Sequence, residues 1–215
     1  MTRHLSRALA LAALFILVLA AVASAATVRT STTPDQLRAG KAAYDTAVTA
    51  GFAKATRQLD AQLRKHPKKP TVVLDIDETT MSNWGCFAAV DFDLGGLATC
   101  VVQGKSVAFP AAKTFIKHAR ARKVAIAFIT GAPQALCAGR RKNLGAQGIK
   151  GPFTLACRPA GDTADTLVPY KSAARKALQK RGATIVLNVG DQASDLAGGA
   201  AKTTVKLPNP IYTSA

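Results

Sequence analysis

Carboxylate side chains follow two of the apolar runs in the sequence. Asp75 and Asp77 come directly after one run with a single residue between them, and Asp191 and Asp195 follow a second run nearer the C-terminus. In an extended chain, side chains two residues apart point to the same side. Carboxylate oxygens are the ligands that hard divalent cations such as Mg²⁺ prefer. These four aspartates are therefore candidate metal ligands.

A hydroxyl, a glycine and a lysine complete the set of residues with a chemical use. Thr130 and Gly131 follow a third apolar run, and a hydroxyl beside a small residue suits the close approach of an oxyanion. Lys171 begins a helical stretch ahead of the run that ends before Asp191. Each signal alone has an ordinary explanation, because Asp-rich strand ends and Thr-Gly pairs are common in turns and most lysines are solvated. Together they supply ligands for one metal ion and one phosphate-sized anion.

The elements that position these residues follow from an alternation of short apolar runs and helical stretches, which predicts a parallel sheet flanked by helices. The expected strands are 71–76, 124–129, 153–156, 184–189 and 203–207, and the expected helices are 110–122, 133–147, 170–181 and a short one from 192. In open parallel sheets, ligands bind at the carboxyl ends of the strands. We therefore expect the polar residues that follow the strands to meet at one edge.

A long amphipathic helix is expected ahead of the sheet. Apolar residues recur mostly at intervals of four from Leu37 to Leu63, and the pattern ends at the breaker that runs from Pro67 to Pro70. The preceding segment, 27–34, is rich in serine and threonine and shows no periodicity.

The first 25 residues have the features of a secretory signal peptide. A positively charged start precedes an apolar stretch over residues 8–22, and Ala23-Ser24-Ala25 matches a cleavage site. The apolar stretch is shorter than the roughly 20 residues of a membrane span, which favours cleavage over an uncleaved anchor. We expect a mature chain of residues 26–215 that has no membrane span and is secreted or held in the periplasm or cell envelope.

Four cysteines lie in the expected mature chain: Cys86, Cys100, Cys137 and Cys157. An even number in an exported chain, without metal-binding spacing, favours two disulfides. Three pairings are possible, and the pairing of sequence neighbours is favoured because both loops then stay local. Buried free thiols are the alternative.

The composition favours anionic partners without identifying them. Lysine and arginine total 29 against 12 acidic residues, and the formal net charge is +17. The 48% of hydrophobic residues excludes wholesale disorder. The basic residues form no recognised nucleic-acid motif, and the runs Arg140-Arg141-Lys142 and Lys68-Lys69 are interpreted as solvated faces. We expect a small phosphorylated substrate and no specific nucleic-acid binding.

Taken together, the motifs resemble those of the haloacid dehalogenase (HAD) superfamily, specifically its secreted acid phosphatase branch (class C, subfamily IIIB). That branch includes bacterial class C-like enzymes and plant vegetative storage proteins. The matching segments are Leu74 to Thr79 with Ser82-Asn83-Trp84, Phe128 to Gly131, Tyr170-Lys171, Asn188 to Leu196, and Lys206 to Pro210 with Tyr212. One departure bears on substrate preference: Ala132 stands where the branch often has arginine.

The resemblance implies an α/β domain over 26–215, with a HAD-like (Rossmannoid) parallel sheet, small cap insertions and an N-terminal helix. It also implies a Mg²⁺-dependent acid phosphatase that hydrolyses small phosphate monoesters, nucleotides among them, through an aspartyl-phosphate. The implied roles are nucleophile for Asp75, general acid and base for Asp77, Mg²⁺ ligands for Asp75, Asp77 (through its carbonyl), Asp191 and Asp195, and phosphate binding for Thr130, Gly131 and Lys171.

Two alternatives remain beside this interpretation. A non-enzymatic anion-binding or storage-type protein on the same fold is one, and the presence of Asp75 argues against it. The other concerns Trp84 and Phe87, which either stack on an aromatic leaving group or belong to the local core.

The signal-peptide interpretation predicts the N-terminus of the exported protein. Cleavage after Ala25 gives a chain that starts at Ala26, because the small residues at 23 and 25 fit the cleavage pattern. Intact-mass measurement of protein recovered outside the cytoplasm checks this, and a recovered chain that still begins at Met1 would contradict it.

Overall fold

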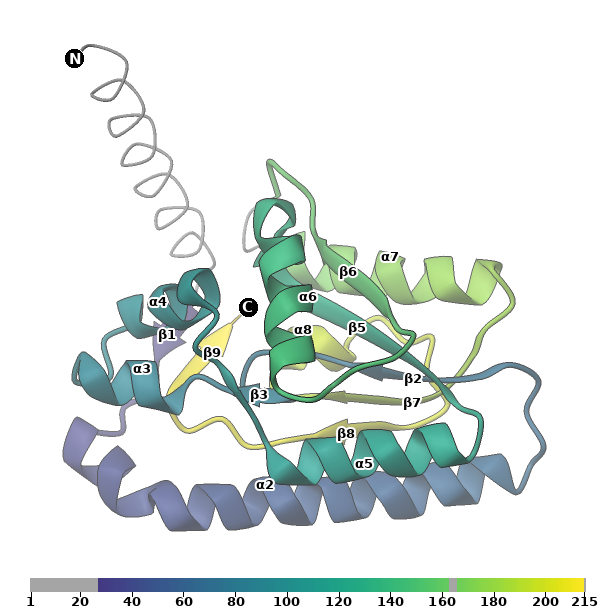
Figure 1. Cartoon of the computed structure of the whole chain (residues 1–215), viewed down its shortest axis with the longest axis horizontal. Coiled ribbons are helices and arrows are strands. Elements are labelled where there is room, and N and C mark those ends of the chain that lie inside the picture. The colour runs from purple at the N-terminus through teal and green to yellow at the C-terminus, as the bar shows by residue number, and fades with distance from the viewer. Residues whose placement is uncertain (1–26, 163–165, 215) are drawn as a thin grey trace.

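The computed structural model describes residues 27–162 and 166–214, and its centre is a five-stranded sheet. All neighbouring strands in this sheet run parallel, in the order β6-β5-β2-β7-β8 (Figure 1). The five strands are β2 (Pro70–Leu74), β5 (Ala125–Pro133), β6 (Thr154–Arg158), β7 (Thr184–Gly190) and β8 (Thr204–Lys206). The prediction of five strands from the apolar runs is confirmed.

Helices cover both faces of the sheet, and the alternation of side chains along the strands explains why. In β2, Val72 and Leu74 pack in one cluster with α2 (Pro34–Leu63) and α5 (Pro110–Ala121). Val73, between them, packs on the opposite face against residues of α7, the helix Leu167–Lys180. Strands buried on both faces are typical of parallel sheets. Figure 1 shows α2 and α5 side by side below the sheet.

The long N-terminal helix α2 is confirmed, and its start is set by local hydrogen bonds. The Thr33 hydroxyl accepts a hydrogen bond from the Gln36 N–H at 3.3 Å, and the Gln36 side chain accepts one from the Thr33 N–H at 2.9 Å. This reciprocal arrangement is a capping box. The buried face of α2 consists of Leu37, Tyr44, Val48, Phe52, Ala55 and Leu59.

An insertion between β2 and α5 covers one side of the carboxyl edge of the sheet. It contains β3 (Met81–Ser82), α3 (Trp84–Ala89), α4 (Gly95–Gln103) and β4 (Val107–Ala108). A disulfide between Cys86 and Cys100 joins α3 to α4. A second disulfide joins Cys137, at the start of α6 (Cys137–Ala146), to Cys157 in β6. The favoured pairing of sequence neighbours is the one in the structure.

A two-stranded antiparallel sheet closes the chain ends and was not expected from the sequence. In it, β1 (Thr27–Arg29) pairs with β9 (Tyr212–Ser214). Strands of three residues are too short to show periodicity, which is why the 27–34 segment carried no signal. The remaining helices follow the expected ones: a 3₁₀ turn, η1 (Gln134–Leu136), precedes α6, and α8 is short (Ala193–Leu196).

None of the helices in residues 27–162 and 166–214 is long and apolar enough to cross a membrane. The expected signal peptide, residues 1–25, lies outside the described residues.

The Cys86–Cys100 disulfide should stabilise the fold through its closed loop. The two cysteines are 14 residues apart, and a loop of this size is worth about 3 kcal/mol by the loop-entropy relation. We expect the double variant Cys86→Ala/Cys100→Ala to lose about that much free energy of unfolding in urea titrations. The free energy of unfolding of the variant Cys137→Ala/Cys157→Ala, which opens a disulfide loop of similar size, is measured for comparison. Parent-like stability in the first variant would contradict the prediction.

Candidate active site

The predicted site residues converge at the carboxyl edge of the sheet. Asp75 directly follows β2, Thr130 lies within β5, and Asp191 directly follows β7. Because β5, β2 and β7 are neighbours in the sheet, these three positions are adjacent. Lys171 reaches the same place from α7, and Asp195 reaches it from α8.

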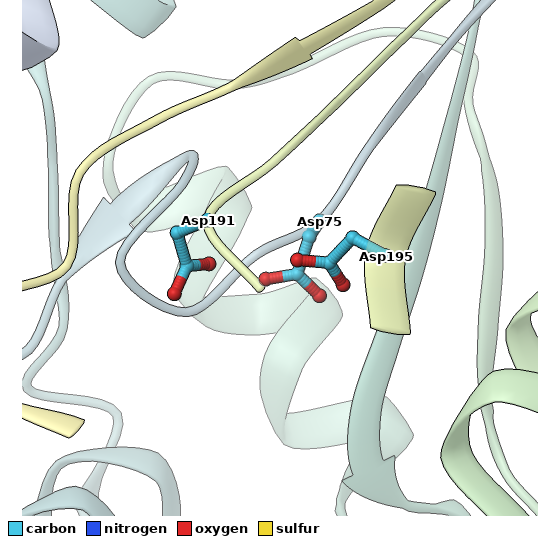
Figure 2. A group of neighbouring side chains, drawn as sticks. All are labelled: Asp75, Asp191 and Asp195. Atoms are coloured by element: carbon cyan, nitrogen blue, oxygen red, sulfur yellow. The ribbon is translucent and has the colours of Figure 1, made fainter. Parts of the chain in front are cut away.

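Three carboxylates form a buried cluster at this edge. Asp75, Asp191 and Asp195 each place an oxygen within 4.8 Å of the others, and all three side chains are buried. Figure 2 shows the carboxylates of Asp75 and Asp195 next to each other, with Asp191 near them on the segment that follows β7. Buried carboxylates need an opposing charge. An all-oxygen set of this kind fits a hard divalent cation, so the cluster could hold a metal ion.

Among the residues that the structure describes, Lys171 is the cation in direct contact with the carboxylates of this cluster. Its ammonium group donates to Asp75 at 3.0 Å and also to Asp195. Burial disfavours the charged ammonium, but the two carboxylates outweigh it and raise the pKa of Lys171. Burial and the charge of Asp195 raise the pKa of Asp75 well above its usual range. One lysine therefore leaves three buried carboxylates incompletely compensated.

Asp191 is held by three side-chain donors. Thr79 donates at 2.8 Å, Asn209 at 2.8 Å and Gln192 at 2.5 Å. Burial and the neighbouring carboxylate of Asp195 raise the pKa of Asp191 to about 7, while the three hydrogen bonds oppose this shift. These three hydrogen bonds orient the Asp191 carboxylate in the absence of a bound ligand.

Asp195 is fixed through both its side chain and its backbone. Its carboxylate accepts a hydrogen bond from the Gln192 N–H at 2.8 Å, which caps the short helix α8. Its carbonyl accepts from Arg175 at 2.5 Å and from Asn188 at 2.8 Å. A Cβ on Gly190 would lie 2.2 Å from the Cβ of Asp195, so only glycine allows this approach.

Asp77 is held by a buried arginine. The Arg140 guanidinium donates to Asp77 at 2.6 Å, Asn83 donates at 2.9 Å, and the Thr130 hydroxyl lies 3.4 Å away. The Asp77 side chain is 15% exposed, whereas that of Arg140 is 0% exposed. The interpretation of Arg140 as part of a solvated face was wrong, although its neighbours in the run are exposed. Arg140 lies four residues before the buried Leu144 on α6, and this spacing is the signal that places it inward.

The Arg140–Asp77 pair continues into a buried polar network. Arg140 also donates to the Ser106 hydroxyl at 3.0 Å, and Ser106 donates to the Asn83 side-chain oxygen at 2.6 Å. Asn83 in turn donates to Glu78 from its side chain at 2.9 Å and from its backbone at 2.7 Å. Burial and the charge of Asp77 raise the pKa of Glu78 to about 8. The network joins α6, the insertion and the turn after β2.

The site opens into a pocket of about 620 Å³, counting the space open to solvent. Asp75, Asp77, Lys171 and Asp191 line its polar side. Its apolar wall consists of Leu97 and Val101 from α4, Ala132 and Pro133 from β5, and Leu167 from α7, and the largely buried Tyr212 of β9 also lines it.

The two aromatic residues expected near the entrance do not line this pocket. Phe87 is 0% exposed, and Trp84 stacks on Tyr44 with ring centroids 5.5 Å apart. Both pack in the cluster that includes Phe92. The structure therefore supports the core interpretation of Trp84 and Phe87.

Arg158 is a pocket residue that was not predicted from the sequence. It ends β6, is buried, and lines the pocket. Its guanidinium donates to the Gly131 carbonyl at 3.1 Å and to the Asp162 carbonyl at 2.7 Å. Its place at a strand end was the available signal, because the other site residues also follow strands. Arg158 thus brings a guanidinium next to Gly131, although Ala132 itself carries no charge.

In this site an aspartate after the first strand of a parallel sheet lies close to a threonine, a lysine and further aspartates from later elements. A fold and site of this kind define a class of phosphotransferase-like proteins. The chain belongs to the HAD superfamily, subfamily IIIB (acid phosphatase), whose family description matches residues 2–215.

Individual relatives and structures agree with this assignment. Acid phosphatase 1 of Solanum lycopersicum is 30% identical over 151 residues, which cover 65% of this chain and 57% of that protein. Vegetative storage protein 2 of Arabidopsis thaliana is 43% identical over 70 residues, covering 33% of this chain and 26% of that protein. The chain thus spans less than two thirds of each of these relatives. The class C acid phosphatase of Bacillus anthracis shares the fold, with a TM-score of 0.67 over 84% of each chain at 21% identity.

The buried position of Arg140 predicts a large loss of stability on its removal. Arg140→Met leaves Asp77 and Ser106 without their buried partner, and we expect the free energy of unfolding to fall by about 3 kcal/mol. The matched change Lys142→Met, two residues along the same helix and exposed, should alter it by less than about 0.5 kcal/mol. Urea titration of both variants measures this. Equal stability of the two variants would show that the Arg140 contacts carry no energy.

Proposed function

We propose that the protein is a Mg²⁺-dependent phosphomonoesterase, an acid phosphatase that hydrolyses small phosphate monoesters through an aspartyl-phosphate on Asp75. The observation that carries the proposal is the contact of Asp75 with Lys171 beside two further buried carboxylates, at the polar side of an open pocket. A nucleophilic carboxylate next to phosphate-binding cations is what such a displacement requires. The family assignment supports the same activity.

The residues present fit the expected metal ion. Asp75 and Asp191 would hold Mg²⁺ together with the backbone carbonyl of Asp77, and their all-oxygen donors suit this ion. The carboxylate of Asp195, the fourth expected ligand, accepts hydrogen bonds from the Lys171 ammonium and the Gln192 N–H, which supports a role in orienting the site around the ion. When bound, Mg²⁺ would offset the repulsion between the anionic nucleophile and the anionic phosphate.

The first half of the reaction forms the aspartyl-phosphate. The Asp75 carboxylate attacks phosphorus, and the bond from phosphorus to the leaving oxygen breaks as Asp77 gives that oxygen a proton. Thr130, the Gly131 backbone N–H and Lys171 would hold the non-bridging oxygens, over which charge spreads in the transition state. Lys171 already contacts Asp75, which supports this placement.

The second half releases phosphate. Asp77, now a carboxylate, takes a proton from a water molecule whose oxygen attacks phosphorus, and the bond between phosphorus and Asp75 breaks. Arg140 is a positioning residue in this scheme, because its hydrogen bond at 2.6 Å fixes the Asp77 carboxylate between α6 and Thr130.

The pocket wall supports a preference among leaving groups. Leu97, Val101 and Leu167 offer aliphatic surface, and neither Trp84 nor Phe87 lines the pocket. The aromatic residue in the lining, Tyr212, is 4% exposed, and its hydroxyl donates to Glu78 at 3.1 Å, so little of its ring is available to stack on a base. We therefore propose monoesters with a compact apolar leaving group as better substrates than nucleotides, the class named with the resemblance.

A storage-type protein without activity is the second candidate, because two of the similar proteins are named vegetative storage proteins. Asp75 and Asp77 are both present with their partners in place, and this supports the enzyme instead. We further propose that the enzyme is exported. The two disulfides and the expected signal peptide support this location.

Two substitutions test the enzyme assignment when their hydrolysis rates are compared across esters with different leaving groups. Asp75→Asn removes the attacking carboxylate and should abolish Mg²⁺-dependent hydrolysis of all monoesters. Asp77→Asn keeps the nucleophile, so the rate for alkyl phosphates should fall by roughly 10² to 10⁴ while aryl phosphates with an acidic leaving group are less affected in the first step. Steady-state rates with and without Mg²⁺ over a graded set of esters measure both effects.

The control for these variants is Asp35→Asn, at an exposed position at the start of α2. It should keep parent rates with every ester. Parent-like hydrolysis by Asp75→Asn would refute the nucleophile assignment. An inert parent across the set, with and without Mg²⁺, would favour the storage-type protein.

A further inference from the structure

The amino edge of the parallel sheet, opposite the candidate active site, collects exposed basic side chains. Each of the five strands is preceded within four residues by at least one exposed lysine or arginine. We name these residues the basic edge: Lys68 and Lys69 before β2, Arg122 and Lys123 before β5, Lys150 before β6, Lys180 and Arg181 before β7, and Lys202 before β8. Figure 1 shows the connections into β2, β5 and β7 together at the end of the sheet remote from α3 and α4.

The strand register brings these connections into a row. Thr71 pairs with Ala125, and Pro70 pairs with Thr184, so the loop that carries Lys69 lies between those before β5 and β7. The Thr184 N–H donates to the Lys69 carbonyl at 3.1 Å. Arg120 donates to the Lys150 carbonyl, which ties the loop before β6 to α5. Neighbouring strands lie about 4.8 Å apart, so five strands make a row of about 20 Å.

Acidic residues do not neutralise the basic edge. Among the described residues, Asp60 is the acid at this end of the fold, and it contacts His118 at 2.8 Å and Arg122 at 3.0 Å. The other described acids lie in the first half of α2, in the candidate active site, or in the segments between α3 and α4 and after β6. Like charges this close repel one another, so binding of an anionic partner would reduce the electrostatic repulsion along the row.

The basic edge lacks the side chains that would favour binding to a membrane surface or to a single-stranded nucleic acid. The exposed large hydrophobic side chains in the described part of the chain are Val28, Val90 and Val107, and none lies in the connections before the five strands. A bilayer surface is usually engaged with apolar residues beside the basic ones. Bases of a single-stranded nucleic acid stack on aromatic side chains. In these connections Phe153 is half-buried and His66 is the exposed ring, so the row lacks a series of exposed aromatic side chains.

We propose that the basic edge binds a linear polyanion through charge alone, its row of cations matched to regularly spaced anionic groups along one chain. Such electrostatic binding does not depend on the order of units in the polymer and does not require a pocket. Because the candidate active site opens at the other edge, the bound protein keeps its pocket accessible to small substrates. The inference does not depend on the proposed function.

The test uses the mature chain and long-chain inorganic polyphosphate as the probe, titrated calorimetrically over a range of salt concentrations. The edge variant Lys68→Gln/Lys69→Gln/Lys123→Gln/Arg181→Gln should bind at least about 10-fold more weakly at low salt and show a shallower salt dependence. A control variant with the same net charge changes exposed lysines elsewhere: Lys54→Gln/Lys105→Gln/Lys113→Gln/Lys142→Gln. The control should bind nearly as the parent does, and circular dichroism should show both variants folded.

Three outcomes would overturn the proposal. No binding of polyphosphate by the parent excludes a polyanion site. Equal weakening in the two variants shows that the net charge of the whole mature chain, +15 once the +17 of the full sequence loses Arg3 and Arg7, attracts the polymer rather than the edge. Tighter, edge-dependent binding to vesicles of anionic phospholipid than to polyphosphate, at equal phosphate concentration, assigns the surface to a membrane instead.

Discussion

Three buried carboxylates held within 4.8 Å of one another are the constraint on which the rest of the site depends. Placing like charges together out of water is unfavourable unless cations and hydrogen-bond donors compensate them. Lys171 contacts two of them, and side chains from three separate segments donate to Asp191. Negative charge remains that these contacts do not compensate, and a divalent cation would supply the missing positive charge. The same imbalance therefore prepares the site for a metal ion.

The surrounding architecture serves to hold this cluster rigidly. The parallel sheet brings Asp75 and Asp191 side by side because β2 and β7 are neighbours, and Gly190 allows Asp195 to approach closely. The buried network from Arg140 through Ser106 fixes Asp77 from the opposite side. Polar networks of this kind are stable only when nearly all members are satisfied, which couples the stability of the insertion to the geometry of the site.

The sheet and the main site residues could be predicted from the sequence because each strand is a continuous apolar run and the chemistry follows its end. Arg140 and Arg158 could not, since a charged residue is ordinarily solvated and only the packing of α6 and β6 shows them buried. Likewise, β1 and β9 depend on a pairing between the two ends of the described chain, which no local pattern encodes. Trp84 and Phe87 were equally compatible with a core and a binding surface, and only tertiary contacts, of Trp84 with Tyr44 and of Phe87 with Tyr212, decide for the core.

The central claim is that Asp75 carries the phosphoryl group during turnover. The most direct measurement is acid quenching of the mature protein during the reaction of a reactive monoester with Mg²⁺, followed by peptide mass spectrometry. The account predicts one phosphoryl group on Asp75, in an acyl-phosphate that hydroxylamine cleaves. A phosphoryl group on any other residue would contradict it. So would an unmodified Asp75 in the Asp77→Asn variant during turnover, because that variant slows the release step and should accumulate the phosphorylated enzyme.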